Sequence, residues 1–312
     1  MRVAIIGNFD GVHGGHRALI RRAREYAGDG PGDRVVAVTF DRHPAAVLRP
    51  DQAPAALATT QRRSVLLREA GADEVVVLPF TPELASRTPE EFARLLREDP
   101  AIAADAVIVG HNFRFGAKAA GDTAMLTSLG RDLGFVVEVV PLVSEGMPDR
   151  GGLADPPGQD DIDGAWSSTR IRASIAAGEL EEASAMLGRP HRLEGTVVRG
   201  DQRGRELGYP TANVEVVTGL AIPPDGVYAG WLVVAGESMP AAVSIGTNPQ
   251  FSGSERRVEA YAIGRDDLDI YGDSVAVDLV ARLRGQEVFA SVEELVEQMG
   301  RDVAAAQAVL TG

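Results

Sequence analysis

The sequence predicts a two-domain α/β protein: a parallel sheet covered by helices, then a small antiparallel β-barrel with a C-terminal helix. Up to about residue 187, short apolar runs rich in β-branched residues alternate with amphipathic stretches, which is typical of βαβ units around a parallel sheet. From Leu193 onward, short strand-like runs follow one another with little helix between them, which favours a small barrel. The texture changes near Gly188, so we expect domains over residues 1–187 and 188–312.

The elements of the first domain follow from composition and periodicity. Apolar, β-branched runs predict strands over residues 2–7, 34–40, 74–80, 106–110 and 135–143. Amphipathic stretches predict helices over residues 16–28, 60–71, 88–99 and 121–134. An acidic stretch rich in Gly and Pro, residues 144–166, is expected to be a long flexible loop. Ligands of parallel sheets bind beyond the carboxyl ends of the strands, so polar residues there are candidates for a site.

The second domain is expected to consist mainly of strands. Short apolar runs separated by Gly, Pro and Asp predict strands over residues 193–200, 211–217, 226–236, 240–246, 256–264 and 274–284. Residues 291–310 repeat apolar positions at helical spacing and predict an amphipathic C-terminal helix.

Composition excludes several classes of function. The formal net charge of −14 argues against a broad nucleic-acid-binding surface, which needs a basic face. The chain has no cysteine, which excludes disulfides, thiolate zinc sites and cysteine nucleophiles. Lys118 is its single lysine and precedes alanine, so a P-loop motif cannot occur, and the absence of HExxH argues against a zinc hydrolase. Neither a signal peptide nor a long apolar run is present, so we expect a cytoplasmic protein that does not enter membranes.

The stretch IIGNFDGVHGGHRALI, residues 5–20, predicts a phosphate site. A strand ends at Gly7, and further glycines allow a ligand to approach the backbone closely. His13 and His16 are three residues apart at the start of a helix, so they share a face, and the N–H groups of that helix terminus attract anions. A glycine turn with two ordinary surface histidines is the alternative.

The sequence GNFDGVHGGH resembles the signature of the HxGH nucleotidyltransferases, and GNFDGVH in particular is similar to the bacterial bifunctional riboflavin kinase/FAD synthetase family. Further segments occur in the order found in that family, namely TFDRHP, LPF, GHNFRFGAKAAGD, SSTRIR, GDQRGRELGYPTAN and GTNPQF. The resemblance covers essentially the whole chain. It implies a Rossmann-like first domain that transfers AMP from ATP to FMN, giving FAD and pyrophosphate, and a barrel domain that phosphorylates riboflavin to FMN.

The resemblance implies a set of site residues in the first domain. It makes His13 and His16 catalytic, and it assigns ATP binding to these two histidines and to Gly7, Asn8, Phe9, Asp10, Ser168, Thr169 and Arg172. It assigns flavin binding to Phe40, His43, Pro44 and Asn112. Ordinary explanations remain open: a serine or threonine helix cap with exposed arginines, a surface turn at Asn112 and a buried turn histidine at His43. The chain has Ala165-Trp166 where the family often has a basic residue, and Arg42 where proline is commoner.

The second domain carries the kinase candidates. Thr211 and Asn213 are two apart on a strand-like segment and point the same way, and paired oxygen ligands suit Mg²⁺ together with substrate phosphates. The resemblance implies an ATP site formed by Gly200, Arg203, Gly208, Pro210, Thr211 and Asn213. It also implies that Glu259 is the catalytic base, although alternation alone places this residue on the polar face of a strand, where a solvated glutamate is common. Gln250 replaces a threonine that is usual in the family.

These observations lead to one prediction with two rivals. We expect a bifunctional enzyme with ATP as co-substrate and Mg²⁺ as cofactor, whose partners are riboflavin, FMN and FAD rather than nucleic acid or membrane. The first rival is an enzyme in which one of the two sites has decayed, and the second is a non-catalytic flavin-binding module. The presence of the candidate residues at both sites argues against both rivals. The sequence makes no prediction of the oligomeric state.

Overall fold

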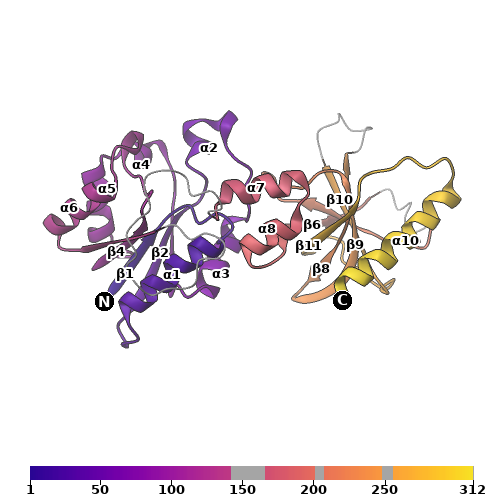
Figure 1. Ribbon diagram of the computed structural model, residues 1–312, viewed down its shortest axis with the longest axis horizontal. Helices are drawn as coiled ribbons and strands as arrows, with labels where there is room; N and C mark the ends of the chain where they lie inside the picture. The colour runs from indigo at the N-terminus through magenta and orange to yellow at the C-terminus, as the bar shows by residue number, and fades with distance from the viewer. Residues whose placement is uncertain (142–165, 201–206, 248–255, 312) are drawn as a thin grey trace. The chain divides into compact units, whose positions relative to one another are not determined.

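The structure is a computed structural model of the 312-residue chain, and it describes residues 1–141, 166–200, 207–247 and 256–311. The chain divides into two compact units (Figure 1). The first unit comprises Met1–Ala56 and Thr60–Ser168. The second unit comprises Leu57–Thr59 and Thr169–Gly312. The loop predicted over residues 144–166 lies outside the described residues, with the exception of Trp166.

A five-stranded parallel sheet forms the centre of the first unit, as the alternating pattern predicts. Its strands are β1 (Arg2–Ile6), β2 (Arg34–Phe40), β3 (Glu74–Leu78), β4 (Ala106–Gly110) and β5 (Val136–Val140). Their order is β3-β2-β1-β4-β5, and each neighbouring pair is parallel. The chain moves outward from β1 to β3 and then returns to the other side of β1 for β4. This reversal is a topological switch point, and ligands of such sheets bind beyond the carboxyl ends of the strands at that point.

Helices connect the strands of this sheet. They are α1 (Gly14–Ala27), α2 (Ala45–Leu48), α3 (Thr60–Glu69), α4 (Pro82–Ser86), α5 (Pro89–Glu98) and α6 (Thr123–Leu133), with 3₁₀ turns at Pro50–Gln52 and Ala117–Ala119. The four helices predicted for the first domain are present. The pattern did not predict α2 and α4, because four or five residues are too few to show helical periodicity.

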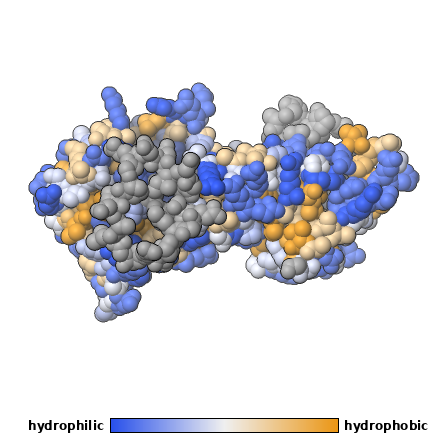
Figure 2. Space-filling model, in the orientation of Figure 1, coloured by the Kyte–Doolittle hydropathy of each residue, from blue (hydrophilic) through white to orange (hydrophobic). Residues whose placement is uncertain are grey.

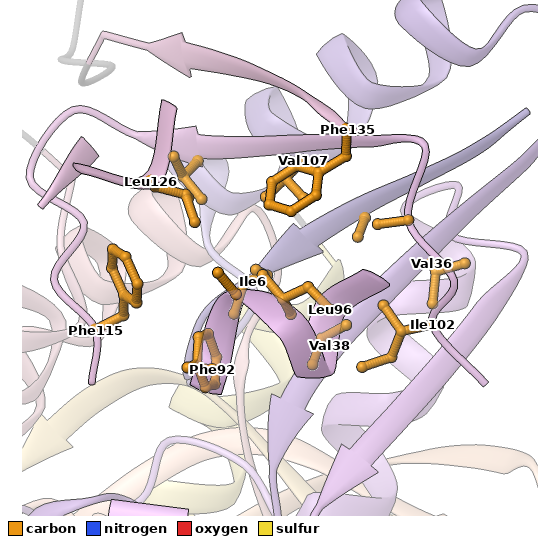
Figure 3. Packing of buried hydrophobic residues seen from close by; sticks show 14 residues of the cluster. Ile6, Val36, Val38, Phe92, Leu96, Ile102, Val107, Phe115, Leu126 and Phe135 are labelled. Carbon is orange, nitrogen blue, oxygen red and sulfur yellow. The ribbon is translucent and has the colours of Figure 1, made fainter. Parts of the chain in front are cut away.

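One part of the core of the first unit lies between the sheet and helices α5 and α6. In Figure 3, Ile6 and Val38 of the sheet lie close to Leu96 and Phe92 of α5, and Leu126 of α6 belongs to the same cluster. All five side chains are at most 5% exposed. Burying one large apolar side chain stabilises a fold by about 1.5–3 kcal/mol, so this layer fixes the strands and the loops at their carboxyl ends.

The second unit contains a closed antiparallel barrel, again as predicted. Its strands are β6 (His191–Val198), β7 (Ala212–Val216), β8 (Gly226–Val234), β9 (Glu237–Thr247), β10 (Arg256–Ala262) and β11 (Ser274–Arg284), in the order β10-β7-β6-β11-β8-β9. Every pair is antiparallel. Glycines allow close strand packing: an ideal Cβ on Gly230 would lie 2.4 Å from the carbonyl oxygen of Asp278.

Three helices accompany the barrel in the described part of the chain: α7 (Ser168–Ala177), α8 (Leu180–Leu187) and α10 (Val292–Thr311). The C-terminal helix α10 contacts β8, β9 and β11, and hydrophilic residues lie along its visible outer side (Figure 2). It is fixed by a nearly buried ion pair in which Arg284 of β11 donates to both carboxylate oxygens of Asp302, at 2.8 and 2.6 Å. Across the described parts of the chain, no helix combines the length and apolar character that crossing a membrane requires.

Candidate functional site

The turn between β1 and α1 has a strained backbone. Phe9 and Val12 have φ values of 47° and 42°, and Gly11 between them has a φ of 77°. Left-handed conformations of non-glycine residues cost on the order of 1–3 kcal/mol and persist where the surroundings enforce them. Here the enforcement is burial, because the side chains of Phe9 and Val12 are each only 1% exposed. Such strain is concentrated at functional sites, and this turn lies beside the switch point of the sheet.

The two histidines of the HxGH segment lie in contact with one another. Their rings stack with centroids 3.7 Å apart, and Phe9 meets His16 edge to face at 5.2 Å. The Nδ1 atom of His16 is buried and has no hydrogen-bond partner among the described residues. Burial lowers the pKa of His16 well below its ordinary value, and positive charges on His13, Arg17 and Arg63 act in the same direction. His16 is therefore neutral at physiological pH and presents an N–H donor suited to an anion.

Asn8 lies at the centre of a small hydrogen-bond network. Its carbonyl oxygen accepts from the Thr39 hydroxyl at 3.1 Å and from Nη1 of Arg63 at 3.2 Å. Its side-chain Oδ1 is buried without a partner among the described residues. Buried polar atoms are almost always hydrogen-bonded, so Oδ1 of Asn8 and Nδ1 of His16 both indicate a polar ligand at this turn.

The SSTRIR segment meets the same turn through its first residues. The Ser168 hydroxyl donates to the carbonyl oxygen of Asp10 at 2.9 Å. Trp166 packs onto Gly14, where an ideal Cβ would lie 1.9 Å from Cζ3 of the indole. The two predicted residues that follow, Thr169 and Arg172, belong to the second unit. Arg172 is four residues after Ser168, so the two share a face of α7.

The predicted flavin residues lie at the carboxyl ends of β2 and β4. Phe40 ends β2 and meets Phe80 edge to face at 5.2 Å. Nδ1 of His43 accepts the backbone N–H of Ala45 at 3.1 Å, so in the neutral ring the proton is on Nε2. Pro44 follows and immediately precedes α2. Asn112 is exposed just after β4. These residues therefore lie on the loops that follow strands either side of β1 in the sheet order.

The barrel contains a cavity of about 410 Å³ at the predicted kinase site. Four predicted residues line it, namely Gly200, Pro210, Thr211 and Asn213. An ideal Cβ on Gly200 would lie 2.3 Å from Nδ2 of Asn213, so a larger residue there would displace the Asn213 side chain. Gly208 has a φ of 85° and does not line the cavity. Arg203 and Gln250 lie outside the described residues, as does Ala165.

Glu259 lies beside Asn213. In β10, Val258 and Ala260 are each 1% exposed, whereas Glu259 between them is half-buried on the other face. The antiparallel register places Glu259 directly opposite Asn213 of β7 and Ser244 of β9. Directly opposed residues share a face of a sheet, with Cβ atoms about 4.5–5.5 Å apart. The candidate base and the candidate metal ligand are thus immediate neighbours, with Glu259 outside the cavity lining.

Sequence reasoning missed three features of these sites. Residues 265–271 form one wall of the barrel cavity. Their position between two predicted strands indicated a loop but not a place in the site. Within that loop Arg265 pairs with Asp267 at 2.7 Å and with Glu237 at 3.2 Å. Arg63 shares the buried face of α3 with Leu66 and Leu67, and a charge at an apolar position of the helical pattern was the available signal. The contact of Trp166 with Gly14 had no local signal.

Comparison with known proteins places both halves of the chain in one family. A family model described as FAD synthetase matches residues 1–148, and one described as riboflavin kinase matches residues 187–310. The bifunctional riboflavin kinase/FMN adenylyltransferase of Escherichia coli K12 is 34% identical over 301 residues, covering 96% of this chain and 90% of that protein. Its counterpart in Pseudomonas fluorescens is 34% identical over 309 residues, covering 98% and 92%.

A solved structure agrees with this assignment in fold. A crystal structure described as a macrolide-efflux protein from Streptococcus pneumoniae superposes with a TM-score of 0.83 at 31% identity, and the match covers 98% of this chain and 93% of that one. These two curated relatives match over at least 90% of their own length and at least 96% of this chain. The chain therefore belongs to the bifunctional riboflavin kinase/FMN adenylyltransferase family.

Proposed function

We propose that this chain converts riboflavin to FMN in residues 188–312 and FMN to FAD in residues 1–187, using ATP in both steps. The observation that carries the proposal is the turn after β1. There, Oδ1 of Asn8 and Nδ1 of His16 are buried polar atoms without partners among the described residues, beside the N-terminus of α1. A helix N-terminus with orphaned polar atoms suits a polyphosphate. The cytoplasmic location expected from the sequence is part of the proposal.

In the first unit, the FMN phosphate acts as the nucleophile. One of its oxygens attacks the α-phosphorus of ATP, the bond from that phosphorus to the bridging oxygen breaks, and pyrophosphate leaves. A phosphate is already anionic at neutral pH, so no general base is required. The chain has to align the two substrates and place donors where negative charge develops. His13 and His16 fill that role from the start of α1, where the N–H groups of the helix point at the same anion.

The remaining candidates are divided between the two substrates. We assign the ATP phosphates to Ser168, Thr169 and Arg172, because hydroxyls and a forked guanidinium bind phosphate oxygens well. The carboxyl end of β2 receives the flavin, where Phe40 offers an aromatic face and His43 an Nε2 donor. Asn112 approaches from the end of β4, across the switch point.

In the second unit, the riboflavin 5′-hydroxyl must lose a proton as the γ-phosphoryl group is transferred. Glu259 accepts that proton in our proposal. The donor set fits Mg²⁺, because Thr211 and Asn213 both line the cavity and carry a hydroxyl and an amide oxygen, and Gly200 lies beside the Asn213 side chain. When bound with ATP, the ion neutralises charge on the β- and γ-phosphates. The assignment of Glu259 is supported by its register, which places it directly opposite Asn213.

The test is to incubate purified protein with riboflavin, ATP and Mg²⁺ and to separate the flavins by chromatography. We expect FMN first and FAD later. Formation of FMN without FAD would mean that only the kinase site is active. Tight flavin binding without any product would mean that the chain is a flavin-binding module.

Glu259→Gln separates the two sites within the same assay. We expect riboflavin phosphorylation to fall by roughly a hundredfold or more, the usual scale for a positioned base, while FAD formation from supplied FMN stays near wild type. Glu215→Gln is the matched control, because this exposed glutamate shares β7 with Asn213 and its face of the sheet. Equal effects of the two substitutions would remove Glu259 from the mechanism.

A further inference from the structure

Arg63 is a buried arginine that has no role in the chemistry proposed above. It lies on α3, is 6% exposed and shares its face of the helix with the buried Leu66 and Leu67. Burying a guanidinium in this way is expensive unless its N–H groups are well matched by acceptors. The hydrogen bonds that its guanidinium donates therefore indicate which parts of the structure it holds together.

The guanidinium joins the ends of two neighbouring strands. Nη1 donates to the carbonyl oxygen of Asn8, just after β1, at 3.2 Å. Nη2 donates to the carbonyl oxygen of Phe40, the last residue of β2. A third bond, from Nη2 to Oγ1 of Thr60, measures 3.3 Å, and the Thr60 hydroxyl itself donates to the carbonyl oxygen of Asp41 at 2.7 Å. One planar group thus fixes the distance between the turn assigned to ATP and the loop assigned to flavin.

The charge of Arg63 is not cancelled locally. Among the residues that the structure describes, no carboxylate lies within 4.0 Å of this guanidinium, and its Nε is buried without a hydrogen-bond partner. Asp10 and Asp41 act on it only at longer range. Burial lowers the pKa of Arg63, but an arginine stays protonated at neutral pH. Two backbone carbonyls and the Thr60 hydroxyl hold this cation, so its role is geometric rather than that of a structural ion pair.

We propose that Arg63 is a positioning residue for adenylyl transfer, which sets the separation of the two substrates by holding the Asn8 and Phe40 carbonyls together. This inference rests on the proposed function of the first unit. Arg63 acts through the backbone, so its loss changes how bound substrates meet more than how tightly each one binds. A misplacement of about 1 Å between reacting groups costs on the order of a hundredfold in rate.

The experiment measures steady-state FAD formation from FMN, with ATP and FMN varied separately, in the full-length chain. Arg63→Met removes the charge and all three hydrogen bonds, whereas Arg63→Lys keeps the charge without the planar fork. Arg68→Met is the matched control, because Arg68 is exposed on the same helix. We expect kcat to fall by about tenfold to a hundredfold in Arg63→Met, with KM for each substrate within about threefold of wild type. Arg63→Lys should recover only a small part of kcat.

Each other outcome decides against the inference or against its basis. A kcat of Arg63→Met equal to that of Arg68→Met overturns it, as does full recovery in Arg63→Lys, which would show that charge alone matters. A loss confined to the KM for ATP would make Arg63 a phosphate ligand and also overturns it. Riboflavin kinase activity and thermal unfolding of the same preparations show whether each variant is folded. If Arg63→Met does not fold, the kcat of Arg63→Lys is compared with that of wild type instead. Failure of the wild type to form FAD would instead refute the proposed function.

Discussion

Replacing Gly14 by alanine tests whether Trp166 holds the start of α7 at the nucleotide turn. An ideal Cβ at position 14 would lie 1.9 Å from Cζ3 and 2.0 Å from Cε3 of Trp166. Carbon atoms in contact are normally about 3.5 Å apart, so the indole must move by more than an ångström. Overpacking of this kind costs about 1–3 kcal/mol. For a unit of this size, we expect the midpoint of thermal unfolding to fall by about 2–12 °C.

The same displacement should reach the active site. Ser168 is two residues after Trp166, and its bond to the Asp10 carbonyl joins α7 to the turn. We expect kcat/KM for ATP in FAD formation to fall by about tenfold in Gly14→Ala, the scale of roughly 1.4 kcal/mol of lost transition-state binding. Riboflavin phosphorylation should be unchanged.

Two further variants make this reasoning refutable. Gly32→Ala is the control, because nothing lies within 4 Å of an ideal Cβ there, and its unfolding midpoint and kinetics should match wild type. In the double variant Gly14→Ala, Trp166→Ala the overlap is gone, so its loss of stability should be smaller than the sum of the two single losses. Strict additivity of the two substitutions would show that Trp166 does not rest on Gly14 in solution.

Three more predictions concern single residues. His16→Ala should lower FAD formation by about a hundredfold or more through loss of a charge-stabilising donor, with FMN formation intact; an unchanged FAD rate would exclude this histidine from the reaction. Because the pKa of His16 is lowered by folding, the unfolded chain binds the proton first as pH falls below the ordinary value of 6.5. This histidine should therefore destabilise the first unit by up to about 1.4 kcal/mol per pH unit below that value, and melting curves of His16→Gln between about pH 7.5 and 5.5 should lack this slope. Asp302→Asn should destabilise the barrel by about 3–5 kcal/mol, because Arg284 keeps a nearly buried charge without its carboxylate. Denaturant unfolding measures this, and the exposed Glu297→Gln should change stability by less than about 0.5 kcal/mol.

Local sequence patterns predicted most of the fold because each element carries its own periodicity. Residues 274–284 are an apolar run bounded by polar residues and form β11 as expected, and the strand predicted over 34–40 is β2. The HxGH turn was located because glycines and histidines at fixed spacing are a local signal. The boundary at residue 187 stays a prediction.

What the sequence could not show depends on contacts between distant segments. Arg63 lies 55 residues from Asn8, and only the sheet order brings α3 against the end of β1. The left-handed backbone at Phe9 and Val12 is enforced by burial, which no local propensity reports. The cavity wall at residues 265–271 depends on barrel closure. The roles assigned to individual site residues stay predictions until the variants are assayed.

The strained turn at residues 9–12 is the proposed ATP site, and its backbone geometry is a product of folding rather than of substrate binding. Its unfavourable φ angles are held by the burial of Phe9 and Val12, so the entropy of ordering this backbone is lost when the core forms. In the proposed function, ATP would then meet a loop already in place, and its binding energy would remain available for the transition state. As a result, adenylyl transfer and core integrity should disappear together in denaturant. A gradual decline of activity before the cooperative transition would mean that the turn relaxes on its own.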